Sequence, residues 1–308
     1  MGMSDFYGPA DRAESIATIH AALDAGIDLL DTGDFYGMGH NELLIRRALQ
    51  DLDPGRRDKV LLSVKFGALR GPDASWGGVD TRPVAVKNFV AYSLQRLGVS
   101  HIDIYRPARL DPAVPIEETV GAVADLIKAG YVRAIGLSEV GPETIRRAQA
   151  VHPICDLQIE YALVSRGPER VIFPLLDQLG IGVTAYGVLS RGLISGHWSK
   201  DQGTGARDFR AHSPRFQGGN LETTYKKLSG ELDRCKARAK SSLIMAQESS
   251  GSRSASLARN WYHLGRVVTL DEVRSKIDAL TVSTVLDFVH AHPARDFSIL
   301  TIGPAALQ

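Results

Sequence analysis

The 308-residue chain has little cysteine and little net charge. Its two cysteines, Cys155 and Cys235, are far apart and lack the spacing of a metal site, so we expect neither a disulfide nor a zinc centre. The net charge of +1 gives no general electrostatic reason to expect nucleic acid or an anionic membrane as a partner. No apolar run is long enough to span a bilayer, and the first residues are not those of a signal peptide. We therefore expect a cytoplasmic protein.

Short hydrophobic strands alternate with helical patterns along the first two-thirds of the chain. The predicted strands are Ile27–Asp31, Val60–Lys65, Ile102–Tyr105, Ala134–Ser138, Leu157–Ile159 and Gly182–Tyr186, and the predicted helices are Ala13–Ala25, Asn41–Gln50, Arg82–Leu97, Ile116–Ala129, Pro142–Val151 and Glu169–Leu179. This repetition predicts an α/β fold of the (β/α)8 TIM-barrel type. Because a closed barrel of that type needs eight strands and six are found, we expect an incomplete one.

Three polar side chains stand where the first two strands end. Asp31 closes its strand, Tyr36 follows in the next loop, and Lys65 closes the second strand. Parallel strands of a barrel present their carboxyl ends at one rim, so we expect the three to meet there. A phenol beside an ammonium and a carboxylate can donate a proton, because the cation stabilises phenolate and lowers the tyrosine pKa. Taken singly, each residue type more often has a structural role: a tyrosine packs in the core, a lysine is solvated, and an aspartate before Thr-Gly caps a turn.

Several short motifs occur in an order that resembles the aldo-keto reductase family. They are Leu29–Gly37, Ser63–Lys65, Gly136–Ser138, Leu157–Tyr161 and Ala185–Gly192. The resemblance runs from the first residues to about Leu221. It implies an oxidoreductase that uses NADPH to reduce a small-molecule aldehyde or ketone.

The resemblance also implies which residues of this chain form the active site. Tyr36 would be the proton donor, Lys65 the group that tunes it, and Asp31 the carboxylate that holds Lys65. The implied cofactor-binding residues are Ser138 and Gln158 at the nicotinamide carboxamide, Tyr186 stacked on its ring, and Gly187, Leu189 and Gly192 in the loop that covers the pyrophosphate. No metal is implied.

The chain departs from the family at the loop after the third predicted strand. Where most members have a histidine before Arg-x-Asp-Pro, this sequence has Ala108, followed by Arg109. Arg109 could replace the histidine as a donor to the carbonyl, or it could be a surface cation. Glu139 also stands where asparagine is common. The family's first strand is missing before Met1, which predicts an open barrel edge.

The C-terminal third changes character, so we predict two domains, a reductase-like barrel over 1–224 and a tail over 225–308. The tail, from about Leu228 to Leu307, resembles the end of the processing-peptidase or pitrilysin-type zinc proteases. We expect helices at Leu228–Met245, Leu270–Ile277 and Val282–His290 and a last strand at Phe297–Ile302. Neither His-x-x-Glu-His nor His-Glu-x-x-His occurs, so His263, His290 and His292 are poor zinc ligands. The chain would then be a fusion protein.

Two functions follow from these patterns. In the first, the incomplete barrel closes well enough to bind NADPH and reduce a carbonyl compound, alone or as a homo-oligomer. In the second, it is a catalytically impaired cofactor-binding or interaction protein. Without the family's phosphate-clasping loop, which is missing from the tail, we expect NADPH to be held weakly. Substrate choice depends on loops whose conformations the sequence does not give, near Ala68–Val79, Arg106–Ala113 and Trp198–Gln217.

Overall fold

The computed structural model describes residues 2–7, 9–193, 208–248, 254, 260–262 and 265–291. Within these residues the chain forms two compact units. The first contains residues 2–188 and 208–211, and the second contains residues 189–193 and the described residues from 212 to 291. None of the helices in these ranges is long and apolar enough to cross a membrane.

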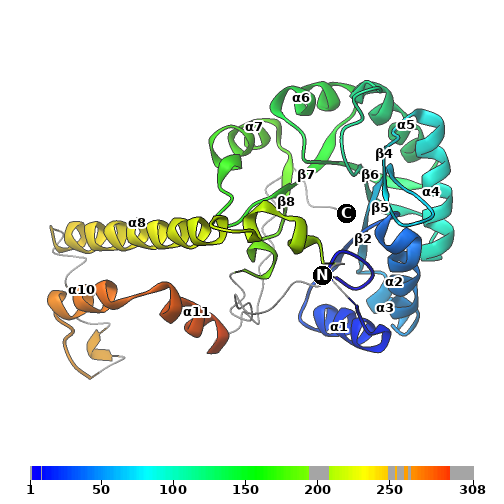
Figure 1. Ribbon diagram of the computed structural model, residues 1–308. Helices are drawn as coiled ribbons and strands as arrows, with labels where there is room; N and C mark the ends of the chain where they lie inside the picture. Colours follow the sequence, from blue (N-terminus) through cyan, green and yellow to red (C-terminus); the bar gives the residue numbers. More distant parts are fainter. Residues whose placement is uncertain are drawn as a thin grey trace. The chain divides into compact units, whose positions relative to one another are not determined.

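A curled, six-stranded parallel sheet forms the centre of the first unit (Figure 1). Its order is β1-β2-β5-β6-β7-β8, so each strand pairs with the next one of the sheet along the chain. The strands are β1 (Leu29–Gly33), β2 (Leu61–Phe66), β5 (Ile102–Pro107), β6 (Val132–Ser138), β7 (Ile154–Glu160) and β8 (Gly182–Tyr186). All six predicted strands are confirmed. The architecture is half of a TIM-type barrel, as the repeating β/α pattern predicted.

Helices cover one face of this sheet (Figure 1). They are α1 (Arg12–Asp24), α2 (His40–Gln50), α3 (Pro54–Arg57), α4 (Pro83–Leu97), α5 (Ile116–Lys128), α6 (Pro142–Val151) and α7 (Ile172–Leu179). Gly98 and Gly180 end α4 and α7 in the left-handed conformation, with φ of 69° and 66°, which glycine adopts without strain. The predicted helices are confirmed, except that the one expected from Glu169 begins as a short 3-10 turn, η2 (Gly167–Arg170).

Alternation along the strands separates two environments. Leu62, Val64 and Phe66 on β2 face the helices and join one large apolar core. The residues between them, Ser63 and Lys65, face the other way, toward the concave side of the sheet, and both are buried. The register places Asp31 of β1 and Arg106 of β5 on the same side, together with apolar residues such as Ile104, and this is where the candidate site lies.

A hairpin next to the site was not predicted. The segment Ala68–Val79, expected to be a loop, contains an antiparallel hairpin of β3 (Ala68–Arg70) and β4 (Trp76–Val79). Three glycines and a serine in this segment weaken its strand pattern, so the hairpin depends on backbone pairing rather than on an apolar alternation.

The second unit is helical where it is described. It contains α8 (Asn220–Glu248), α10 (Leu270–Ala279) and α11 (Val282–Ala291), besides the single turns η3 (Ser190–Gly192) and η5 (Pro214–Phe216). Lys240 and Lys236 of α8 bind Asp278 of α10, at 2.6 Å to Oδ1 and 2.9 Å to its carbonyl oxygen. The three predicted tail helices are therefore confirmed, with α8 longer than expected. The predicted strand Phe297–Ile302 lies outside the described residues.

Candidate active site

Asp31 and Lys65 form an ion pair at the carboxyl end of neighbouring strands. Strand β1 pairs in parallel with β2, in a register that places Asp31 opposite Ser63 and Gly33 opposite Lys65. Lys65 Nζ donates to Asp31 Oδ2, and the lysine side chain is 5% exposed against 31% for the aspartate. Burial lowers the pKa of Lys65, while Asp31 raises it. Burial also raises the pKa of Asp31, but Lys65 and then Arg106 outweigh that effect and hold it below its usual value.

Tyr36 lies against this pair, in the loop that leaves β1. Lys65 Nζ is 5.1 Å from the centroid of the Tyr36 ring, so the predicted trio does meet at one rim. The pKa prediction is wrong, however. Burial, followed by the negative charge of Asp31, raises the pKa of Tyr36 above its ordinary value, and the cation Arg109 opposes them only in part. The phenol therefore keeps its proton at physiological pH, as a general acid must.

Arg109 is also brought to the site. Its Nη1 donates to the carbonyl oxygen of Ala108 at 2.6 Å. Its positive charge opposes, but does not cancel, the rise in the pKa of Tyr36 and of Tyr186. Its role as a replacement for the missing histidine stays a prediction.

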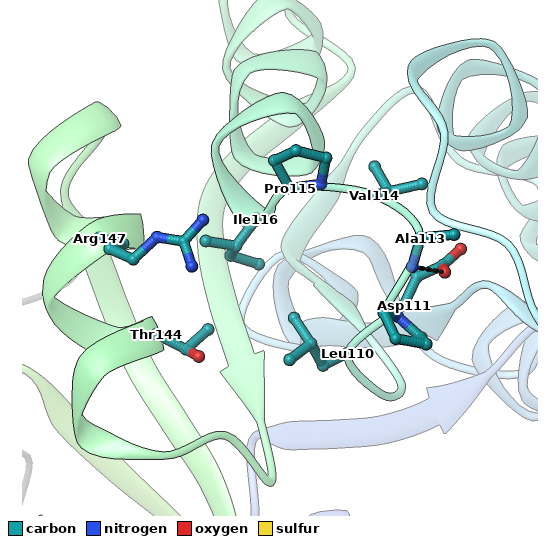
Figure 2. Close-up of a pocket in the computed structure, with 9 residues that line it drawn as sticks. Leu110, Asp111, Ala113, Val114, Pro115, Ile116, Thr144 and Arg147 are labelled. Atoms are coloured by element: carbon teal, nitrogen blue, oxygen red, sulfur yellow. Dashed lines mark hydrogen bonds between the residues drawn. The ribbon is translucent and has the colours of Figure 1, made fainter.

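The loop that carries Arg109 is held by Asp111. Asp111 accepts backbone hydrogen bonds from Ala113 at 2.9 Å and from Thr81 at 3.2 Å. Figure 2 shows the pocket between this loop and helix α6. Its other charged side chain, Arg147, is paired with Glu117 at 2.6 Å. Both charged side chains that line this pocket already have partners, so the pocket offers neither of them for catalysis.

Ser138 and Gln158 lie side by side at the same rim. They are partners in the parallel register of β6 and β7, and both are buried. Among the described residues neither side chain has a hydrogen-bond partner, so a hydroxyl and an amide are free to bind a planar carboxamide. Tyr186 ends β8, where its hydroxyl is hydrogen-bonded to Glu139, and burial followed by that bond raises its pKa.

The remaining predicted cofactor residues fall on both units. Gly187 directly follows Tyr186 with φ of 64°, a conformation that favours glycine. Leu189 and Gly192 belong to the second unit, at the 3-10 turn η3. Their role at the pyrophosphate stays a prediction.

Sequence reasoning missed an aromatic cluster around Tyr36. The Tyr36 ring has edge contacts with Phe35 at 4.7 Å and with Phe6 at 5.8 Å between ring centroids. Trp76 of the β3–β4 hairpin contacts Phe35 at 6.0 Å and remains 54% exposed. Phe6 is fixed in place because its carbonyl oxygen accepts from the backbone of Phe209 at 2.6 Å. Phe6 and Trp76 are distant in sequence from the motifs, so only the fold reveals this apolar wall.

A second cluster supports the loop of Tyr36 from the side of the helices. Asp34 is 9% exposed, and its pKa is raised to about 7 by burial and then by the negative charge of Glu42, against the opposing charge of Arg96. Glu42 is fully buried, and Arg96 Nε donates to its Oε2. Gly39, with φ of 93°, makes room for Arg96, whose Cδ would lie 2.7 Å from an added Cβ.

This cluster predicts a pH dependence for Asp34→Asn. Unfolded Asp34 loses its proton near pH 4, whereas folded Asp34 holds it up to about pH 7. Wild-type stability should therefore fall as the pH rises through this window, by about 4 kcal/mol at most. We expect Asp34→Asn to gain stability relative to wild type from pH 4 to pH 7 and to keep that advantage above pH 7. Urea unfolding at pH 4.5, 6 and 8 measures it, and an advantage independent of pH would contradict the proposed cause.

Comparison with known proteins places the chain in a family. The model of the aldo/keto reductase family matches residues 1–299. The chain belongs to this family. A Glycine max protein named "Probable aldo-keto reductase 1" is 41% identical over 236 residues, which cover 75% of this chain and 66% of that protein. The matched region thus spans slightly less than two-thirds of that relative.

Solved structures give the same result. A glycerol dehydrogenase from Gluconobacter oxydans aligns with a TM-score of 0.65 and 26% identity, covering 100% of this chain and 93% of its own. An aldo/keto reductase from Klebsiella pneumoniae, in complex with NADP and acetate, aligns with a TM-score of 0.52 and 27% identity, over 60% of this chain and 62% of its own. The family match extends past residue 224 to residue 299 and gives no support to the predicted protease-like tail or to a fusion protein.

Proposed function

We propose that this chain is an NADPH-dependent reductase that converts an aldehyde or ketone to an alcohol. The observation that carries the proposal is the ion pair of the buried Lys65 with Asp31, with the protonated phenol of Tyr36 beside it, at the carboxyl rim of a parallel sheet. Its membership of the aldo/keto reductase family supports the reaction class. The NADP complex of the Klebsiella pneumoniae relative supports the choice of cofactor.

Each residue would have a separate task. The hydride for the carbonyl carbon would come from NADPH when it is bound. Tyr36 would give its hydroxyl proton to the carbonyl oxygen, while the charge of Lys65, held by Asp31, stabilises the phenolate that remains. Arg109 would donate to the same oxygen in place of the missing histidine.

The cofactor residues are proposed on the chemistry of their side chains. Among the described residues the hydroxyl of Ser138 and the amide of Gln158 have no hydrogen-bond partner, so they suit the nicotinamide carboxamide, and Tyr186 offers a ring surface at the next strand end. Gly187, Leu189 and Gly192 are proposed for the pyrophosphate. We expect no metal in this reaction, because a phenol and two cations can stabilise the developing alkoxide.

The aromatic cluster favours an apolar substrate. Phe6 and Phe35 pack on the Tyr36 ring, and the small Ala108 is buried next to them. A carbonyl compound with a hydrophobic or aromatic group would bury that group against these rings, where each buried aromatic contact contributes about 0.5–1.5 kcal/mol beyond its area. Cytoplasmic location and self-association stay predictions.

Cofactor titration followed by a turnover assay tests the function. Quenching of protein fluorescence by NADPH measures binding, and loss of NADPH absorbance with benzaldehyde measures reduction. We expect both, with NADPH bound weakly because the phosphate-clasping loop is missing. Binding without turnover of any aldehyde or ketone in a panel would favour the second function, a cofactor-binding protein with an impaired site.

We also propose that 225–308 is a unit separate from the reductase-like region 1–224, with no chemistry of its own. The described residues from 225 to 291 all belong to the second compact unit, which supports this proposal, although that unit begins at residue 189. Limited trypsin digestion should cut first within the second unit and leave a fragment that retains residues 2–188. The intact protein should not hydrolyse casein. Early cleavage among β1 to β8, or peptidase activity that chelators abolish, would contradict it.

A further inference from the structure

A buried arginine lies beneath the Asp31–Lys65 pair. Arg106 is fully buried on β5, where the register places it beside Lys65. Its Nη2 donates to Ser63 Oγ at 3.0 Å and to Asp156 Oδ2 at 3.0 Å. Ser63 Oγ in turn donates to Asp31 Oδ1 at 2.7 Å. A continuous chain of hydrogen bonds thus joins Asp156 on β7 to Asp31 on β1.

The chemistry of the donor groups fixes the direction of each hydrogen bond in this series. A guanidinium has only donors, so the Ser63 oxygen must accept from Arg106. The hydroxyl has one proton, and that proton is left for Asp31. Arg106 therefore determines how the Ser63 hydroxyl points, and Asp31 receives a hydrogen bond that favours its charged form.

The surrounding strands are built to hold this arginine. Gly136 of β6 has no side chain, and an added Cβ would lie 2.5 Å from Asp156 Oδ1 and 3.1 Å from Arg106 Cζ. Asp156 also accepts from the hydroxyl of Thr184. Asp156 therefore pairs with the Arg106 charge through Nη2, while Nε and Nη1 have no partner among the described residues.

The groups that face the ion pair come from three elements. Asp31 faces Lys65 and Ser63 of β2, Arg106 of β5 and Tyr36 of its own loop. Burial raises the pKa of Asp31, and Lys65 followed by Arg106 reverses this and holds the pKa below its ordinary value. Lys65 has two further cations near it, Arg106 and Arg109, which add to the effect of burial in lowering its pKa.

We propose that Arg106 is a positioning residue for the proton donor. Acting through Ser63, it keeps Asp31 as a carboxylate turned toward Lys65, so that the lysine charge stays beside the Tyr36 ring. The proposal rests on the proposed reductase function, because it assigns Arg106 a part in proton delivery by Tyr36. Arg106 would thus be a fourth residue of the site, which acts on the trio of Asp31, Tyr36 and Lys65 without belonging to it.

Three variants separate positioning from simple support of the fold. Arg106→Lys keeps the charge. Arg106→Met combined with Asp156→Asn removes both charges and leaves neither buried alone, and Ser63→Ala removes the link while the Arg106–Asp156 pair remains. Carbon-13 NMR of aspartate-labelled full-length protein, with Asp31→Asn to assign the signal, measures the pKa of Asp31. The pH profile of kcat for benzaldehyde reduction and the Kd of NADPH are measured on the same samples.

We expect the pKa of Asp31 to rise by about one unit in the double variant and in Ser63→Ala, the size of one lost charge or hydrogen-bond contact. The acidic limb of the kcat profile should move upward by the same amount, with the Kd of NADPH unchanged, and Arg106→Lys should restore most of both. An unchanged pKa of Asp31 in folded Ser63→Ala and in the folded double variant would overturn the proposal. Absence of turnover in wild type, with the pKa shift still present, would instead contradict the proposed function.

Discussion

Tyr36→Phe should lower carbonyl reduction by about 100-fold to 10,000-fold while NADPH binding stays nearly unchanged. The substitution removes only the hydroxyl, and the ring contacts with Phe6 and Phe35 remain possible. The phenol would act only on the transition state, where negative charge develops on the carbonyl oxygen. The loss should therefore appear in kcat rather than in the Kd of the cofactor.

The matched control is Tyr92→Phe, which removes a hydroxyl from a tyrosine on α4 that is 53% exposed. Steady-state kinetics with benzaldehyde and NADPH compare the two variants with wild type. We expect the control to match wild type. Full turnover in Tyr36→Phe would move the acid role to another group, and Arg109, close to the same phenol, would be examined next.

Arg96→Met should destabilise the first unit by about 3–5 kcal/mol. Arg96 donates to Glu42, whose side chain has no exposed surface, so its loss leaves a buried carboxylate without a cation. It also opposes the rise in the pKa of Asp34, which lies two residues before Tyr36. Helix α2, which carries Glu42, directly follows the loop of Tyr36, and turnover should fall as this loop loosens.

Two further variants test the reason for this loss. In Arg96→Met combined with Glu42→Met both charges are absent, and an apolar replacement of a buried ion pair is often close to neutral, so most of the stability should return. Arg47→Met removes an exposed arginine that binds Asp51 on the surface, where such pairs contribute about 0–1 kcal/mol. Urea unfolding followed by circular dichroism measures all three. An equal loss in the single and double variants would mean that lost packing, and not the unpaired charge, is the cause.

The sequence determined the order and type of the elements in the first unit. Apolar runs bounded by glycine and by strand-ending polar residues predicted all six strands, because a strand buried on its helix side must present hydrophobic residues in a short, dense run. The same ends located Asp31 and Lys65, since parallel strands place their carboxyl ends at one rim. The family resemblance, and not the strand pattern, indicated Ser138, Gln158 and Tyr186. These predictions depend on local pattern, which the sequence holds in full.

Two predicted strands were too short, and the residues left out of them belong to the site. Ending the third predicted strand at Tyr105 left Arg106 in a loop, and starting another at Leu157 left out Asp156. The structure extends both strands, so both residues face the concave side and pair at 3.0 Å. Fifty residues separate them along the chain, and no local pattern connects a charge on one strand with its partner two strands away.

The electrostatics of Tyr36 were decided by the tertiary structure alone. From the sequence, the nearby lysine favours a lowered tyrosine pKa, because an opposite charge stabilises phenolate. In the fold, burial of the ring and the charge of Asp31 act in the other direction and prevail. The sequence can indicate which charges lie near Tyr36. The burial that raises its pKa exists only in the folded protein, where Phe6 and Phe35 pack against the ring.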